Sequence, residues 1–332
     1  MLPIKRPPTI RDVAAAAGVS TATVSKFING LQRFSPEVEK RLAEAIATLG
    51  YRLNQQARSM VTGKTRSFGL AVQDVRNPHF ANIIKGANRV ALEQDYNLLV
   101  VDVQERAAHE RHLLEALSGR VDGLIVSSRL PDEALSWLTE LGKPVVFFGR
   151  RDAAGIRCVR SDGHRAAYML GRHLVETGRR KIAWLGFPGS RWNSERLTGL
   201  SEALALNELV PTVFEVDAPS MEGGQRQASS LLMGGERPDA VVCYNDLVAI
   251  GLMHETQALG LRVPDDVAIA GFDDIPVAAF MHPALTTVNM RSEEQGEAAM
   301  RLLLDAMRGS TDASDILMEP RLVPRASTTR IL

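Results

Sequence analysis

Polar residues follow directly after short apolar runs at four places in the chain. Asp74 to Phe80 follow one run, Arg191 to Arg196 a second, Asn245-Asp246 a third, and Gly271 to Asp274 a fourth. Carboxylates, an amide and an arginine are suited to directional hydrogen bonding with a ligand rich in hydroxyl groups. These segments are therefore the first candidates for a binding site.

Three common catalytic motifs do not occur in the sequence. The serine-nucleophile elbow G-x-S-x-G, the phosphate-binding loop and the zinc motif H-E-x-x-H are all missing. His109 and His112 are spaced like metal ligands, but they stand in a charged run without a second pair of ligands. We therefore expect a protein that is not an enzyme and that holds neither a metal nor a cofactor.

The elements that must position these polar segments alternate between apolar runs and amphipathic stretches. Helices are expected over residues 80–92 and 111–117, where apolar residues recur at helical spacing. Strands that are apolar throughout indicate parallel sheets covered on both faces, and such sheets bind ligands at the carboxyl ends of their strands. The expected strands are Phe68–Val72, Leu98–Val101, Val121–Val126, Val145–Phe148, Lys181–Gly186, Ala240–Cys243 and Val267–Ala270.

The first 50 residues predict a small module of three helices. Gly18 is suited to a left-handed helix end, and the tight turn Gly18-Val19-Ser20 joins the first two helices. Such a pair with a third bracing helix is a helix-turn-helix module, although a three-helix bundle without DNA function remains the alternative. The helices are expected over residues 10–17, 21–28 and 36–49, opened by Thr9, Ser20 and Ser35.

Composition and charge describe a soluble chain with a basic head. Of the 332 residues, 45% are apolar and 23% charged, and no run reaches the roughly 18 to 20 apolar residues of a membrane span. Residues 1–66 hold 11 Lys and Arg against 4 Asp and Glu, whereas the remainder holds 28 against 35. The excess of +7 favours nucleic acid as partner, although basic arms also bind membranes or are merely solvated. Two isolated cysteines and an N-terminus without a signal-peptide core indicate the cytoplasm.

The run from Thr9 to Asn29 resembles the DNA-binding head of the LacI/GalR family of transcription regulators. The family signature A-G-V-S-x-x-T-V-S stands here as Ala17 to Ser25, followed by Leu49 to Asn54 and Ala57 to Met60. The resemblance extends to about Arg325. It implies a repressor whose second helix enters the major groove of operator DNA.

The resemblance also implies a role for individual residues of the head and linker. A hinge helix from Asn54 to Val61 would form only on operator DNA, with Met60 as a wedge in the minor groove. Lys26 replaces the more usual arginine or histidine, and Met60 the usual leucine, so another member's operator is not transferable. The expected base readers are Thr21, Ala22 and Lys26. The expected further contacts with DNA are Thr9, Ser20, Thr23, Ser25, Asn29, Asn54, Ala57 and Arg58.

For the body, the resemblance implies a fold of the periplasmic sugar-binding-protein type with a ligand between two lobes. Three of the expected ligand contacts each have an ordinary structural alternative: Arg196 in a surface salt bridge, Asp273 as the cap of a turn, and Phe80 as a core residue. Asp246 is expected to cap a helix beside the site. The expected contacts with a sugar or sugar-acid effector are His79, Phe80, Arg150, Arg196, Asn245 and Asp273.

The whole chain is therefore expected to be an α/β protein with an N-terminal three-helix helix-turn-helix head and two doubly wound α/β lobes. The head would span residues 1–52, the hinge 53–66 and the effector-binding and dimerisation domain 67–332. The N-lobe would take about 67–160 and 290–320, and the C-lobe about 161–289 and 321–332. Reading a two-fold operator requires a homodimer, and a tetramer stays open. The alternatives are a transport-type sugar-binding protein and an enzyme on a doubly wound fold.

Overall fold

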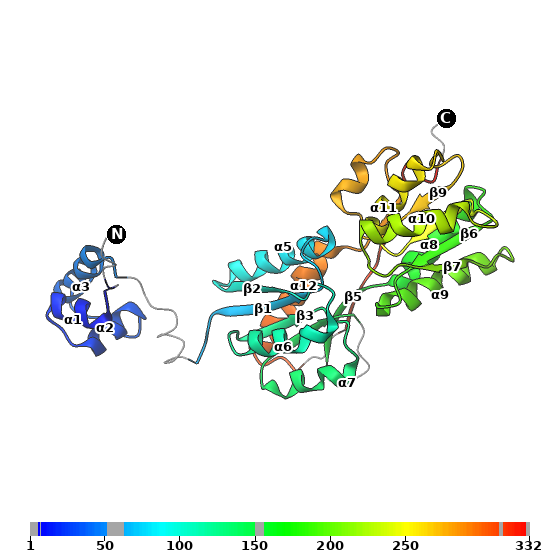
Figure 1. Ribbon diagram of the computed structural model, residues 1–332. Helices are drawn as coiled ribbons and strands as arrows, with labels where there is room; N and C mark the ends of the chain where they lie inside the picture. The colour runs from blue at the N-terminus through cyan, green and yellow to red at the C-terminus, as the bar shows by residue number, and fades with distance from the viewer. Residues whose placement is uncertain (1–5, 7, 52–62, 150–155, 312–314, 330–332) are drawn as a thin grey trace. The chain divides into compact units, whose positions relative to one another are not determined.

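The computed structural model describes residues 6, 8–51, 63–149, 156–311 and 315–329. Its contacts divide the chain into two compact units, Met1–Thr65 and Arg66–Leu332. The predicted hinge residues Asn54, Ala57, Arg58 and Met60 lie outside the described residues. Figure 1 shows the elements of each unit.

The first unit is a bundle of three helices, as the sequence predicts. Thr9 and Asp12 form a reciprocal capping box at the start of α1, and Gly18 ends it with a φ of 65°. Its core consists of small and branched side chains centred on Val13, Val24 and Leu42, all fully buried. The helices are α1 (Ile10–Ala17), α2 (Thr21–Ile28) and α3 (Pro36–Leu49).

One lobe of the second unit, the N-lobe, is built on a six-stranded sheet in the order β11-β5-β4-β3-β1-β2. Every pair of neighbouring strands in it is parallel. The central strands are buried from end to end because helices cover both faces of the sheet. The strands are β1 (Ser67–Val72), β2 (Asn97–Asp102), β3 (Gly123–Val126), β4 (Val145–Phe148), β5 (Arg157–Ser161) and β11 (Asp315–Met318).

Two helices pack on one face of this sheet and the remaining helices on the other. On the first face, α5 (Pro78–Glu93) and α12 (Ser292–Met307) share a core with Phe68, Leu70 and Ile125. On the second, α6 (Ala107–Ser118), α7 (Asp132–Leu135) and the 3₁₀ helix η1 (Ser136–Leu141) share one with Leu124 and Phe147.

The C-lobe repeats this plan on a four-stranded parallel sheet in the order β7-β6-β8-β9. Trp184 and Phe272 are fully buried on the face covered by α8 and α9, and the other face is covered by α10 and α11. The strands are β6 (Ile182–Gly186), β7 (Thr212–Glu215), β8 (Ala240–Cys243) and β9 (Ala268–Ala270). The helices are α8 (Gly163–Glu176), α9 (Arg191–Ala205), α10 (Met221–Met233), α11 (Asp246–Ala258) and the 3₁₀ helix η2 (Pro276–Phe280).

The chain passes between the lobes after β5, after β10 (Thr287–Asn289) and between β11 and β12 (Arg321–Val323), and β10 and β12 form an antiparallel pair. The predicted α/β architecture of a helical head and two doubly wound lobes is confirmed. The sequence does not predict β5, β7, β10, β11 or β12 as strands, because these segments mix charged or polar residues with apolar ones. The predicted strand from Val121 begins only at Gly123.

Glycines allow α5 and α12 to lie unusually close together. A Cβ atom at Gly86 would lie 1.9 Å from the carbonyl oxygen of Glu293, and one at Gly296 would lie 2.0 Å from that of Ile83. Both obstacles are backbone atoms of the opposite helix, so a side chain there would force the two helices apart.

Gly86→Ala should lower the free energy of unfolding of the second unit by about 1–3 kcal/mol, because overpacking separates α5 from α12. Urea unfolding followed by tryptophan fluorescence measures this directly, since Trp137, Trp184 and Trp192 all belong to that unit. Gly119→Ala is the matched control, because its Cβ would meet no atom closer than 3.9 Å. Equal losses in the two variants would contradict the close packing of these helices.

Candidate functional site

The exposed face of α2 carries the three predicted base readers. Thr21, Ala22 and Lys26 are exposed, whereas Val24 on the opposite face is fully buried in the core of the head. Ala22 and Lys26 are one helical turn apart and so lie on the same face. Because this face carries no bulky apolar group, it can approach the edges of DNA bases closely.

The neighbouring polar residues of α2 are held by local hydrogen bonds. The Ser20 hydroxyl accepts from the backbone N–H of Thr23 at 3.1 Å and caps the helix. The Asn29 amide donates to the Ser25 carbonyl at 2.8 Å, and the Lys26 ammonium donates to the Gln32 side chain at 3.1 Å. Ser20 and Asn29 thus have structural roles in the head itself.

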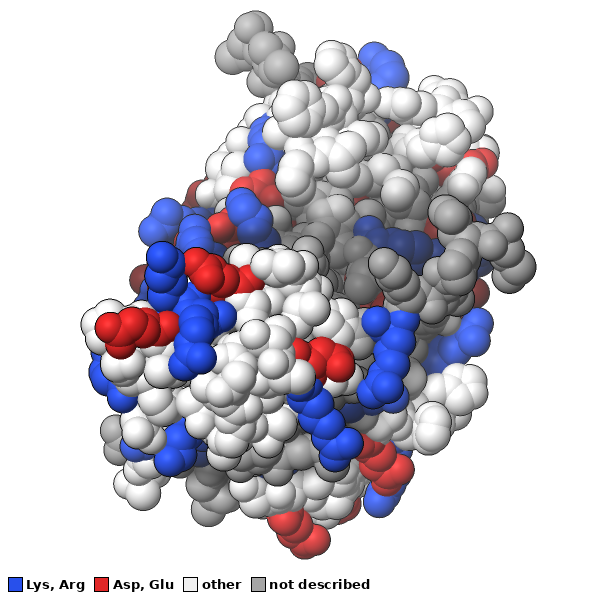
Figure 2. All heavy atoms as spheres, turned by 90° about the vertical axis from the view of Figure 1, so that its left-hand side faces the viewer, with Lys and Arg blue, Asp and Glu red and all other residues white. Residues whose placement is uncertain are grey.

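Charge alone does not mark the DNA-binding surface. On the face drawn in Figure 2, lysine and arginine side chains lie at many points with acidic side chains between them. Within the head, the candidate surface for contact with DNA is therefore the exposed face of α2.

A cleft in the second unit brings the predicted effector residues together. It lies between loops that follow the carboxyl ends of strands in both lobes. The space not filled by atoms is about 640 Å³, part of which is open to solvent. Of the predicted residues, the cleft is lined by His79, Phe80, Arg196, Asn245 and Asp273. Arg150 lies outside the described residues.

His79 and Asp273 face each other across the cleft, one from each lobe. The His79 Nδ1 atom lies 3.4 Å from Asp273 Oδ1 and 2.8 Å from the Ser292 hydroxyl. Burial lowers the pKa of His79 below its usual 6.5, and Arg196 lowers it further against the opposing effect of Asp273. Burial raises the pKa of Asp273, whereas His79 and Arg196 lower it. The imidazole is therefore uncharged at neutral pH.

Arg196 is a buried cation with unused hydrogen-bonding capacity. It is 5% exposed, and its Nη1 donates to the Tyr244 carbonyl at 2.5 Å. The guanidinium lies over the rings of Tyr244 and Phe272, 5.1 and 4.5 Å from their centroids. Its buried Nε has no hydrogen-bond partner in the described chain. A buried N–H without a partner is costly, and a ligand oxygen would satisfy it.

The structure corrects the assignment of the cap of α11. Asn245, and not Asp246, occupies the N-cap position, where its Oδ1 accepts from the Val248 N–H at 2.9 Å. Asp246 is the first helical residue; it accepts from the Thr287 hydroxyl at 2.6 Å and from the Ile275 N–H at 2.9 Å. Burial, followed by the proximity of Asp273, raises its pKa well above the usual value. Asp246 therefore does not line the cleft but links the start of α11 to Thr287 and Ile275.

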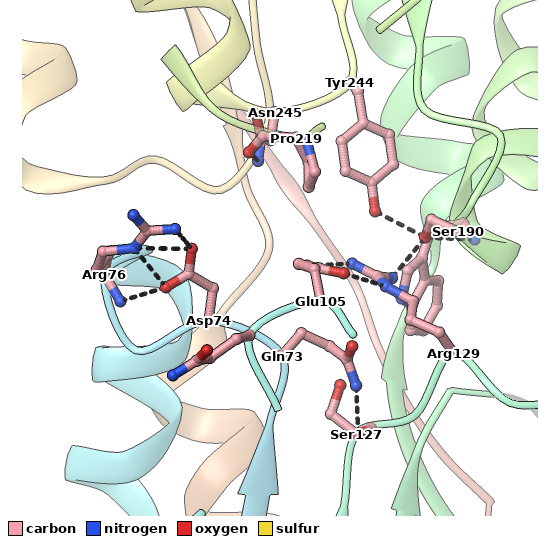
Figure 3. A network of polar contacts seen from close by, with 12 residues as sticks. Gln73, Asp74, Arg76, Glu105, Ser127, Arg129, Ser190, Pro219, Tyr244 and Asn245 are labelled. Carbon is pink, nitrogen blue, oxygen red and sulfur yellow. Dashed lines mark hydrogen bonds and ion pairs between the residues drawn. The ribbon is translucent and has the colours of Figure 1, made fainter. Parts of the chain in front are cut away.

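A polar network that was not predicted from the sequence crosses the cleft (Figure 3). Arg129 donates through Nε and Nη2 to both carboxylate oxygens of Glu105, at 2.9 and 2.8 Å. Its Nη1 donates to the Ser190 hydroxyl at 2.8 Å, and the Tyr244 hydroxyl donates to the same oxygen at 2.7 Å. All four residues follow predicted strands, so the rule that identified Asn245 and Asp273 could also have identified them.

Other charges near the cleft are already paired. Arg191, the first residue of the second polar segment, contacts Asp132 at 2.6 Å and donates to the Leu130 carbonyl at 3.1 Å. Within the described ranges, no three His, Cys, Asp or Glu side chains gather as metal ligands, His109 and His112 included. No helix of the described chain is both long and apolar enough to cross a membrane.

Comparison with known proteins matches both units. A family described as bacterial regulatory proteins, lacI family, matches residues 9–54, and a periplasmic binding protein-like domain matches residues 172–328. The chain is 33% identical over 328 residues to the HTH-type transcriptional repressor PurR of Klebsiella pneumoniae (strain 342), covering 96% of each protein.

Solved structures of regulators share the fold. The lac repressor dimer bound to operator and the anti-inducer ONPF superposes with a TM-score of 0.89 at 27% identity, covering 98% of this chain and 100% of that one. The transcriptional regulator CelR in complex with cellobiose has a TM-score of 0.72 at 31% identity, covering 96% and 99%.

A helix-turn-helix head joined to a two-lobed binding body defines a DNA-binding transcription regulator of the kind that a small molecule controls. The chain belongs to the LacI family of these regulators.

The two roles of Asn245, as helix cap and as part of the cleft wall, can be separated. Asn245→Ala should lower the free energy of unfolding of the second unit by about 1 kcal/mol, because the cap on Val248 is lost. Asn245→Ser keeps an uncharged side-chain oxygen for the cap and loses the amide that donates to the Pro219 carbonyl. Urea unfolding followed by tryptophan fluorescence should thus show a smaller loss for Asn245→Ser than for Asn245→Ala. The opposite order would rule out the cap as the main contribution.

Proposed function

We propose that this regulator is a homodimeric repressor whose affinity for its operator depends on whether a sugar or sugar acid is bound in the cleft between its lobes. The observation that carries the proposal is the buried Arg196, whose Nε has no partner in the described chain and which lines the same cleft as Asp273. An effector controls operator binding only if it binds one conformation of the body better than another.

For operator recognition, Thr21, Ala22 and Lys26 read bases in the major groove. A lysine donates to guanine acceptors, while the methyl groups of threonine and alanine contact the methyl group of thymine. Thr9, Ser20, Thr23, Ser25 and Asn29 position the helix on the phosphates. In the hinge, Met60 acts as the wedge, flanked by contacts from Asn54, Ala57 and Arg58.

The choice of a sugar-like effector rests on the chemistry of the cleft. It combines a carboxylate, an amide and a guanidinium with the Phe80 ring, a set suited to dense hydroxyl groups on an apolar skeleton. The relative CelR was solved with cellobiose, and the lac repressor with ONPF. As a cytoplasmic regulator the protein would catalyse no reaction.

Lys26→Ala should relax base preference at one position in each half-site, at a cost of about 1–3 kcal/mol there, because a base contact is lost. Selection from a randomised operator library before and after the substitution measures this. Lys40→Ala is the control, since Lys40 is an exposed lysine of α3 that pairs with Glu44. An unchanged preference in Lys26→Ala would remove this residue from the base readers.

Asp273→Asn should strongly weaken the effector's influence on operator binding, because the cleft loses a carboxylate that accepts hydrogen bonds from ligand hydroxyls. Losing a charged partner of a ligand hydroxyl should cost about 1.5–3 kcal/mol of effector affinity. Fluorescence anisotropy on the selected operator, titrated with sugars, sugar acids and purines, measures both quantities.

Asp217→Asn provides the control for Asp273→Asn, because Asp217 forms an exposed ion pair with Arg226. A full effector response in Asp273→Asn would withdraw Asp273 from the site. Binding of a purine and of no sugar or sugar acid by the wild type would withdraw the proposed ligand class.

A further inference from the structure

The Glu105–Arg129 pair is an unusual feature of the cleft, because both charges are largely buried. The side chains are 20% and 11% exposed, and two hydrogen bonds join them in a bidentate arrangement. Burial lowers the pKa of Arg129, but Tyr244 and Glu105 raise it by more, so the guanidinium stays charged. Both residues line the wall of the cleft (Figure 3).

A strained turn places Glu105 at this position. Gln104 and Glu105 both have left-handed backbones, with φ values of 58° and 54°. Such a conformation is strained for a residue other than glycine and persists only where the surroundings hold it. Here the Glu105 N–H donates to the Gln73 carbonyl at 2.8 Å and the Gln104 N–H to Asp102 at 3.1 Å. The fold therefore holds this carboxylate in the cleft at an energetic cost.

Arg129 is fixed on its other side as well. Its Nη1 reaches the Ser190 hydroxyl of the C-lobe, and its guanidinium lies 5.6 Å from the centroid of the Phe187 ring. A guanidinium has five N–H donors, and the bonds to Glu105 and Ser190 use three of them. Arg129 is thus held in a fixed position in the cleft wall. Two of its N–H donors are not used by these bonds, and its charge is neutralised by Glu105.

The charges of the described cleft residues balance. Glu105 matches Arg129, Asp273 matches Arg196, and the imidazole of His79 is uncharged at neutral pH because burial lowers its pKa. A carboxylate entering such a site would lose its hydration without meeting a net positive charge. Hydroxyl groups need only hydrogen-bond partners, which these paired groups supply.

We propose that Glu105 is a specificity-determining residue: by neutralising Arg129 it makes the cleft select an uncharged polyhydroxylated ligand and reject the corresponding acid. This rests on the proposed sugar-type effector and narrows it to neutral sugars. Glu105 acts through Arg129, so its role appears in the ratio of affinities for a neutral ligand and its acid.

The test compares matched ligands that differ only in a hydroxymethyl or carboxylate group: glucose with glucuronate, and galactose with galacturonate. Calorimetry and thermal shift on the full chain are run at equal ionic strength for the wild type and Glu105→Gln. The wild type should bind the neutral member of a pair at least about tenfold more tightly. In Glu105→Gln this preference should fall by about tenfold or more, because Arg129 keeps an uncompensated charge. The variant should also gain thermal stabilisation by acetate that the wild type lacks.

Two further variants keep the result interpretable. Glu115→Gln removes the same charge from an exposed i,i+4 pair with Arg111 on α6, away from the cleft, and should behave as the wild type. The double variant Glu105→Gln/Arg129→Gln removes both charges and should restore the preference for the neutral ligand. It also covers the case in which Glu105→Gln alone fails to fold.

An unchanged ratio in Glu105→Gln, a wild type that prefers acids, or no gain of acetate binding would each overturn the role of Glu105. A double variant that favours acids would do the same. A wild type that responds to no sugar, beside a Glu105→Gln variant that gains acetate binding, would instead overturn the proposed sugar effector and leave the charge role standing.

Discussion

The arrangement of the cleft depends on one constraint: every strand pair within the two large sheets is parallel. The central parallel strands are covered on both faces and leave polar side chains no place along their length, so these collect in the loops at the strand ends. Glu105 follows β2, Arg129 follows β3 and Ser190 follows β6, while Asn245 and Asp273 follow β8 and β9. The parallel topology of both lobes thus brings polar side chains from five separate stretches of the chain to one cleft.

Burying so many polar groups forces them to satisfy one another. Glu105 and Arg129 within the N-lobe, and His79 with Asp273 between the lobes, pair groups from different elements. Left-handed backbones occur at Asp273, with a φ of 110°, as well as at Glu105. Strain at the residues that line a binding cleft is consistent with backbones fixed in advance for a ligand. The His79–Asp273 contact and the Arg129–Ser190 hydrogen bond join the two lobes, so a ligand that rearranges them would also change how the lobes meet.

The head follows a different principle, because its helices are defined by local signals. Thr9, Ser20 and Gly18 are placed where caps and turns require them, and a small apolar core suffices to hold three short helices. A face that binds DNA needs no pocket, only exposed small and basic side chains such as those on α2. Control by an effector therefore has to come from the body, through a difference in affinity between two of its conformations.

The sequence by itself determined the elements whose signals are local: the capped helices of the head, the apolar central strands such as Val145–Phe148, and the polar segments that contain Asn245 and Asp273. Strands that carry polar residues, such as β5 and β11, were not predicted, because their place in the sheet comes from pairing with distant segments. Only the tertiary structure decided that Asn245 rather than Asp246 caps α11, and that Glu105 and Arg129 form a pair. Whether a charged residue is free to bind a ligand depends on the partners that folding places around it. Those partners come from other parts of the chain, and no local pattern specifies them.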